Sequence, residues 1–201
     1  MENIKACEEL KQAFKKLPSI GDRTAQRLAY ACLKMDKEDL DKFIRAFENV
    51  ENNVHTCPRC GMYIDSSSCP ICDDVSRDSS ILIVVEDMKD VLSFERTNKF
   101  NGKYFILNGL ISPLKGKDAS SLHLDNLKKI IEEDKVKEVI LATSSTLEGE
   151  TTALYINRYL ESMNIKISRL AYGLPIGADL EYVDGLTIER SLINRVDMKR
   201  G

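Results

Sequence analysis

The sequence predicts an α/β fold that is preceded by helices and a four-cysteine module and followed by a C-terminal extension. Three observations support this. The first part of the chain has the apolar spacing of helices, four cysteines then form two CxxC pairs, and from residue 80 onward apolar strands alternate with helices. Such alternation implies crossover connections and a mostly parallel sheet. The expected segments are residues 1–55, 57–72, 80–175 and 176–201.

The N-terminal segment, residues 1–55, reads as three helices. Two of them flank a Pro-Ser-Ile-Gly turn. The third, over about residues 36–52, is rich in charge and has a single apolar stripe at helical spacing. We expect that stripe to be the buried face of the helix: Leu40, Phe43, Ile44 and Phe47.

Four strands are expected in the segment 80–175. Each is a run of apolar and β-branched residues, typical of strands buried on both faces. The intervening segments have helical patterns, including one amphipathic helix over residues 120–134. The strands are "SILIVVE" (80–86), "KYFILNG" (103–109), "KEVILAT" (137–143) and "IKISRLAY" (165–172).

The composition restricts the functional classes. With 29 Lys and Arg against 32 Asp and Glu, the net charge is −3, so a nucleic-acid surface must be a local patch. No apolar run approaches the roughly 18–20 residues that span a bilayer. The N-terminus, "MENIKACEELKQAF", is charged and amphipathic, unlike a signal peptide. We expect a soluble, cytoplasmic protein without membrane association.

The stretch "CPRCGMYIDSSSCPIC" has the spacing of a metal site. Each CxxC turn directs two thiolates at one ion, and the spacer can return the chain to complete a tetrahedron. Four thiolates leave no open coordination position, so we expect one structural Zn²⁺ per chain, with an iron–sulfur cluster or a redox dithiol pair as alternatives. The expected ligands are Cys57, Cys60, Cys69 and Cys72.

The stretch "LPSIGDRTAQRLA" (17–29) resembles the helix-hairpin-helix motif of DNA-binding proteins. In that motif, backbone N–H groups at the turn point at a DNA phosphate, a contact that is blind to base sequence. Basic residues concentrate around the turn. The predicted DNA-binding residues are Gly21, Arg23, Arg27, Lys15 and Lys16.

Two residues depart from the motif. Ser19 replaces the first of its two usual glycines, and Asp22 places a negative charge where phosphate should approach. The alternative interpretation is an ordinary αα-hairpin with a solvated basic face.

The strand that ends at Glu86 and the later stretch "LATSSTLEGE" (141–150) resemble the Toprim domain of topoisomerases, primases and some nucleases. The family places carboxylates at two positions that are Ser144 and Thr146 here, where hydroxyls are poor ligands for Mg²⁺. Glu148 and Glu150 remain. They could hold a metal loosely, favour the dipole of a helix start, or bind a protein partner.

The order of a helical hairpin, a four-cysteine module and a Toprim domain without its Asp pair resembles the RecR family of bacterial recombination mediators. Further matching stretches are "VVEDMKDVLSFERT", "GKYFILNGLISPLKG" and "AYGLPIGADLEYVDGLTIERSLINR". The last lacks an accompanying phosphate-binding loop, so ATP hydrolysis is not indicated.

The resemblance implies a non-enzymatic protein of DNA repair. RecR proteins form ring-like tetramers from dimers, through their N-terminal hairpins and C-terminal segments. They act with RecO and RecF at single-strand gaps, where RecA replaces the single-strand-binding protein. By position, Arg23 and Arg27 would face DNA, and Glu86, Glu148 and Glu150 would offer a surface to RecO.

Two other functions stay open at this point. The first is a metal-dependent Toprim nuclease that uses Glu86, Glu148 and Glu150. The second is a regulatory module that binds specific DNA, which would require base-reading residues on a groove-fitting element. The sequence does not reveal such an element.

Overall fold

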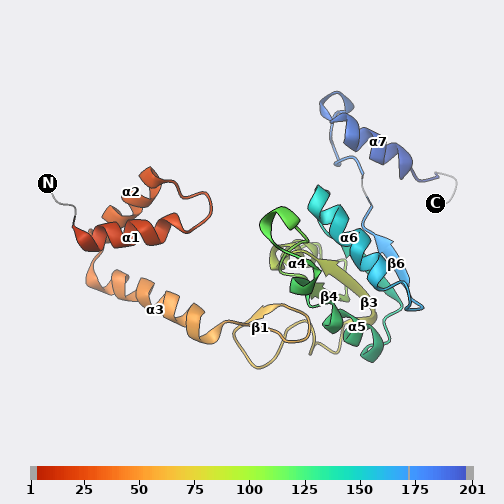
Figure 1. Ribbon diagram of the computed structural model, residues 1–201, viewed down its shortest axis with the longest axis horizontal. Helices are drawn as coiled ribbons and strands as arrows, with labels where there is room; N and C mark the ends of the chain where they lie inside the picture. Colours follow the sequence, from red (N-terminus) through yellow and green to blue (C-terminus); the bar gives the residue numbers. More distant parts are fainter. Residues whose placement is uncertain (1–3, 172, 198–201) are drawn as a thin grey trace. The chain divides into compact units, whose positions relative to one another are not determined.

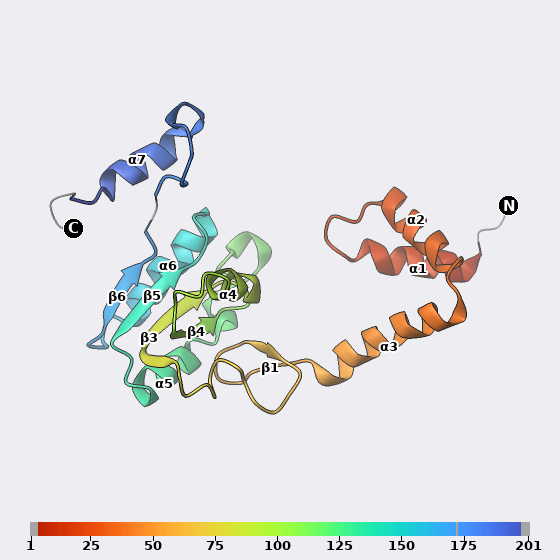
Figure 2. The same cartoon turned by 180° about the vertical axis from the view of Figure 1, so that it is seen from behind.

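The computed structural model describes residues 4–171 and 173–197 and divides the chain into two compact units, Met1–Val54 and His55–Gly201 (Figures 1 and 2). Each unit is described by itself. Tyr172, which belongs to the fourth expected strand, lies outside the described residues, as do residues 1–3 and 198–201.

The first unit is helical. It consists of α1 (Lys5–Lys15), α2 (Asp22–Cys32) and α3 (Lys37–Asn53). Cys7 of α1 and two alanines of α2, Ala25 and Ala29, are buried where the first two helices pack together. Small side chains at this position allow the two helix backbones to approach closely. The tight hairpin that the sequence predicts is therefore present.

The expected burial of the apolar stripe on α3 is wrong for the single chain. No residue of this helix is buried, and Phe47, the last residue of the stripe, is 65% exposed. Helical periodicity shows that a face is apolar but not what covers it. In the described part of the first unit nothing covers this face, so the apolar surface is exposed.

The second unit is built on a parallel four-stranded sheet, as the sequence predicts. Its strands are β3 (Asp78–Val85), β4 (Gly102–Ile106), β5 (Glu138–Ala142) and β6 (Lys166–Arg169), in the spatial order β4-β3-β5-β6. All three pairings are parallel. Val85 lies opposite Ala142, so β3 and β5 end at the same level.

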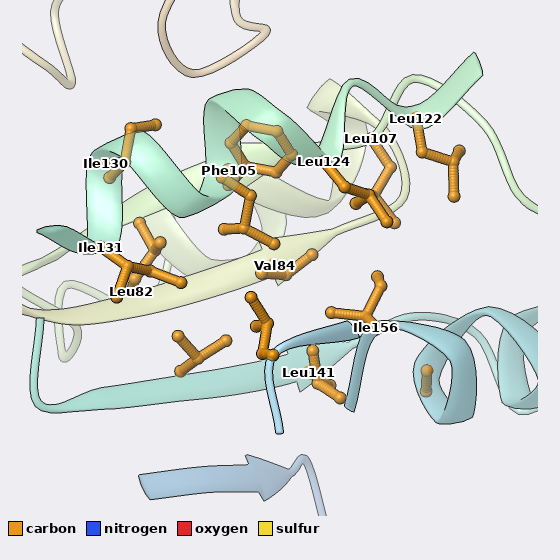
Figure 3. Packing of buried hydrophobic residues seen from close by; sticks show 14 of the residues in the cluster. Leu82, Val84, Phe105, Leu107, Leu122, Leu124, Ile130, Ile131, Leu141 and Ile156 are labelled. Atoms are coloured by element: carbon orange, nitrogen blue, oxygen red, sulfur yellow. The ribbon is translucent and has the colours of Figure 1, made fainter. Parts of the chain in front are cut away.

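Alternate residues of the strands face two separate cores. Leu82 and Val84 of β3 face one side, where α5 (Leu124–Glu133) and α6 (Leu147–Tyr159) cover the sheet, as Figure 3 shows for Ile131 and Ile156. Ile83 and Val85 face the opposite side, covered by α4 (Met88–Glu95) and the cysteine module. Burial on both faces explains why the strands read as continuous apolar runs.

The cysteine module packs directly on the sheet. Its short strands β1 (His55–Thr56) and β2 (Tyr63–Ile64) pair antiparallel. The backbone N–H of Ile106 donates to the carbonyl of Cys60 at 2.8 Å, so the module also continues the edge of β4. Gly61 has φ +82°, and a Cβ there would lie 2.4 Å from the Ile106 carbonyl oxygen. Only glycine allows this close approach.

The chain reverses direction across the sheet between β3 and β5. From β3 it crosses by α4 to β4 on one face, and from β5 it crosses by α6 to β6 on the other. In open parallel sheets the crevice outside the carboxyl ends of two such strands is the usual ligand site. The two segments that resemble a Toprim corner leave the sheet at this point.

The C-terminal part contains a 3₁₀ turn, η3 (Leu180–Tyr182), and the helix α7 (Gly185–Ile193). It has no buried residue among those described, and its apolar side chains, such as Leu192 and Ile193, are more than half exposed. Within residues 4–171 and 173–197, no helix combines the length and apolarity that a bilayer crossing requires.

Candidate functional site

The corner at the carboxyl ends of β3 and β5 brings the expected acidic residues to one edge of the sheet. Glu86 directly follows the last residue of β3 and is half-buried. Glu148 and Glu150 lie in the first turn of α6, where negative charge favours the helix dipole. The register of β3 against β5 therefore produces the neighbourhood that the sequence predicts.

The two hydroxyl residues at the corner have structural partners. The side chains of Ser144 and Thr146 share a hydrogen bond of 2.9 Å. Thr146 also caps α6, because its Oγ1 accepts from the Gly149 backbone N–H at 3.2 Å. A Cβ on Gly149 would lie 2.1 Å from the Ser144 carbonyl oxygen, so glycine is required for the helix to start this close to the strand end.

An arginine at the end of β6, the strand beside β5, binds the β5 side of this corner. The guanidinium of Arg169, at the end of β6, donates to the carbonyl oxygens of Leu141 at 2.8 Å and Thr143 at 2.7 Å, and to that of Ser144 at 3.2 Å. It also donates to Oε1 of Glu150 at 2.7 Å. The two charged side chains are 23% and 33% exposed. Arg169 therefore supplies positive charge to the carboxylate and the strand-end carbonyls.

This arrangement decides what the corner can do chemically. Glu150 is held in an ion pair by a cation that belongs to the fold. In the described residues, Glu86, Glu148 and Glu150 do not form a group of carboxylates converging on one point, whereas the four cysteines of the module do form such a metal-ligating group.

The four cysteine sulfurs converge as the CxxC spacing predicts. All lie within 4.8 Å of one another, with Cys57 Sγ 4.0 Å from Cys72 Sγ and Cys60 Sγ 3.6 Å from Cys69 Sγ. A tetrahedral ion with metal–sulfur bonds of about 2.3 Å separates its sulfurs by roughly 3.8 Å. These residues could therefore bind a metal ion after small shifts of the sulfur atoms.

The surroundings favour the thiolate form, which metals bind, at Cys72, whereas the hydrogen bond with Cys72 raises the pKa of Cys60 and burial raises the pKa of Cys69. The hydrogen bond with the Cys60 thiol lowers the pKa of Cys72 to about 6, and the positive charge of Arg59 acts in the same direction. The Arg59 guanidinium is itself held by Asp134 at 2.8 Å and Glu133 at 3.1 Å. Two acidic residues at the end of α5 thus hold the guanidinium of Arg59 beside the cysteine cluster.

At the helical hairpin, the acidic residue that departs from the motif is neutralised within the hairpin. Asp22 Oδ1 lies 3.1 Å from Nζ of both Lys11 and Lys15. Hydrogen bonds from Lys11 and then from Lys15 lower the pKa of Asp22, so the ion pairs persist at neutral pH. Lys15, a predicted DNA contact, is thus ion-paired with Asp22, and Lys11 is paired with the same carboxylate.

The turn itself has the features that bind an anion. Gly21 is the N-cap of α2 and provides no side-chain cap, so the first backbone N–H groups of the helix remain available to a ligand. Arg23 and Arg27 are exposed on α2, and Lys16 is exposed across the turn. Ser19 adopts φ +63°, which explains why the motif prefers glycine there.

Sequence reasoning did not anticipate the contacts of two basic side chains, Arg169 and Lys11. Arg169 is one basic residue in a strand pattern, and its role depends on the register that places β6 beside the end of β5. Lys11 is seven or more residues from the turn in sequence, yet helical geometry brings it to Asp22. A search for cations able to reach the acidic corner, rather than for further acids, would have pointed to Arg169.

The chain is similar to known proteins along most of its length. The RecR helix-hairpin-helix family matches residues 7–50, the Toprim domain family matches residues 80–171, and the RecR C-terminal family matches residues 173–196. A curated relative from Enterococcus faecalis, "Recombination protein RecR", is 40% identical over 187 residues, which cover 93% of this chain and 94% of the relative.

If Arg169 holds the corner together, Arg169→Gln should destabilise the second unit by about 1–3 kcal/mol, because Glu150 and three carbonyls lose a charged donor. Urea denaturation measures this. Arg158→Gln, an exposed arginine on α6, is the matched control and should change the midpoint little. Equal midpoints for both variants would contradict the role assigned to Arg169.

Proposed function

The chain belongs to the RecR family of recombination proteins, and we propose that it is a non-catalytic recombination mediator that acts in DNA repair as a ring-like DNA clamp. In this proposal it works with RecO and RecF to help load RecA at single-strand gaps, in the bacterial cytoplasm in association with the nucleoid. One observation carries the non-catalytic part: Glu150, one of the three glutamates at the Toprim-like corner, is bound by Arg169 at 2.7 Å.

DNA contact is assigned to the hairpin. The exposed α2 N-terminus and the cations around it support a grip on phosphate: Gly21, Arg23, Arg27, Lys15 and Lys16. Such a contact is independent of base sequence. A single patch of this size binds weakly, but several copies in one assembly bind the same strand with avidity.

Assembly is assigned to the two uncovered apolar surfaces. The stripe on α3 and the apolar side chains of the C-terminal segment are exposed, and contiguous exposed apolar surface often marks an interaction site. In this proposal they make the subunit contacts of a dimer-to-tetramer ring. The acidic corner is the proposed seat of RecO, because Glu86 and Glu148 remain half exposed there.

The cysteine module is assigned to one structural Zn²⁺ held by Cys57, Cys60, Cys69 and Cys72. The sulfur separations and the lowered pKa of Cys72 support this choice. When bound, the ion would fix the two CxxC turns. The chain's own residues do the rest: Cys60 extends the edge of β4, and Met62, Ile64 and Ile71 cover the sheet.

The proposed DNA contact predicts that the Arg23→Ala, Arg27→Ala double variant binds DNA more weakly at every sequence and loses about two units from the slope of log K against log salt. Fluorescence anisotropy at several salt concentrations measures this. The double variant Arg96→Ala, Lys99→Ala removes two exposed charges from the second unit and should behave as wild type. Unchanged affinity of the hairpin variant at low salt would refute the assignment.

The proposed zinc site predicts about one Zn²⁺ per chain by elemental analysis and a loss of sheet stability when a chelator removes it. The expected loss extends to the sheet because the cysteines share a core with β3 and β4. Cys60→Ser should lower the metal content, whereas Cys32→Ser should not. Iron, or no metal, in protein purified without chelator would be the contrary result.

The alternative of a Toprim nuclease is tested by incubating the protein with Mg²⁺ or Mn²⁺ and gapped or supercoiled DNA. We expect no cleavage, because the carboxylates do not converge on a metal position in the described chain. The Glu86→Gln variant distinguishes cleavage by this protein from cleavage by a contaminating nuclease, which the substitution would not affect. Cleavage by the wild type that this substitution abolishes would overturn the non-catalytic proposal.

A further inference from the structure

The loop that follows β4 presents an unusual side chain to solvent. Leu114 lies in the 3₁₀ turn η1 (Pro113–Lys115) and is 99% exposed, more than any other leucine among the described residues. Full exposure of a leucine is unfavourable in water. The loop therefore presents an apolar side chain to solvent, away from the sheet core.

The shape of the loop that carries Leu114 is fixed by backbone hydrogen bonds within the loop. The backbone N–H of Ser112 donates to the Lys117 carbonyl at 2.9 Å, and that of Lys117 donates to the Ser112 carbonyl at 3.0 Å. Gly116 closes the turn with φ +65°. Ser112 itself is buried, and the N–H of neighbouring Ile111 donates to Thr152 Oγ1 of α6 at 2.9 Å. The tip is thus built in advance of any ligand, which reduces the entropy lost on binding.

The tip of the loop carries two positive charges, and the first acidic residue after it is Asp118, whose carboxylate accepts from Ser120. Residues 109–117 contain Lys115 and Lys117 and no acidic residue, although the chain as a whole has a net charge of −3. In the described structure neither lysine is ion-paired to a carboxylate. An exposed apolar group followed by two cations complements a polyanion that also offers apolar faces, which describes DNA with accessible bases.

We propose that the loop 112–117 is a second DNA contact, in which Leu114 packs against a base at a junction between single- and double-stranded DNA while Lys115 and Lys117 bind the flanking phosphates. The proposal rests on the DNA-repair function proposed above and adds a site outside the hairpin. Apolar side chains such as leucine are known to insert between base steps. At a junction the last base pair already has one open face, so less unstacking is needed than inside a duplex.

The experiment uses the full-length protein and gapped DNA with 2-aminopurine at the last paired nucleotide beside the gap. Wild-type protein should raise the 2-aminopurine fluorescence as the base loses its stacking, and Leu114→Ser should lose most of that rise. The Lys115→Gln, Lys117→Gln double variant should lower the salt slope by up to about two units. Val75→Ser, at an apolar residue that is 100% exposed outside the loop, is the matched control and should keep both signals.

Leu114 has no buried contact to lose, so equal melting temperatures of wild type and Leu114→Ser identify a direct effect. A full fluorescence rise with Leu114→Ser, or no rise with a wild type that binds the DNA, would overturn the loop contact and leave the proposed function standing. If Leu114→Ser gives the wild-type DNA signals but no longer binds a protein partner, the DNA contact is overturned and the loop is assigned to that partner instead. A wild type that fails to bind gapped DNA at low salt would remove the proposed function and the loop contact together.

Discussion

The charged hydrogen bonds of Arg169 are the interaction on which the functional corner depends. A parallel sheet ends in a row of carbonyl groups, and the loop after β5 adds two more within reach of one guanidinium. Arginine matches this need because its planar donors serve several acceptors at once and it remains charged under all physiological conditions. By also binding Glu150, it ties the start of α6 to the end of β6. The shape of the corner is therefore maintained by protein groups.

The cysteine module stabilises the sheet at a second place, the face formed by Ile83 and Val85. Its sulfurs lie in the same apolar cluster as Ile83, Val85 and Tyr104, and the Cys60 carbonyl extends the edge of β4. Asp134 connects the two parts further, since it accepts from both Arg59 and Lys103. A metal ion at the cysteines would consequently stabilise the sheet and not only a linker. The corner and the module are two supports of one small domain.

Much of this could be predicted from the sequence because it depends on local pattern. Strand and helix alternation identified the parallel sheet, and CxxC spacing identified the sulfur cluster. What could not be predicted depends on pairing between distant segments. The role of Arg169 follows from the register of β6 against β5, and no local signal contains that register. The predicted burial of the apolar stripe on α3 was wrong for a different reason. Periodicity identifies an apolar face, but it does not tell whether the same chain or another one covers that face.

The substitutions at the Toprim corner make physical sense as a set. Ser144 and Thr146 stand where the related enzymes have carboxylates, and their hydroxyls bond to each other and cap α6 without needing a counter-ion. Two further carboxylates beside Glu148 and Glu150 would repel one another unless a divalent cation bound, because one arginine cannot neutralise four negative charges. With hydroxyls in their place, the charge of Arg169 suffices to hold Glu150, and the corner can keep its shape without a metal. The corner thus combines the Toprim fold with two hydroxyl side chains and an arginine that binds Glu150, while Glu148 stays half exposed.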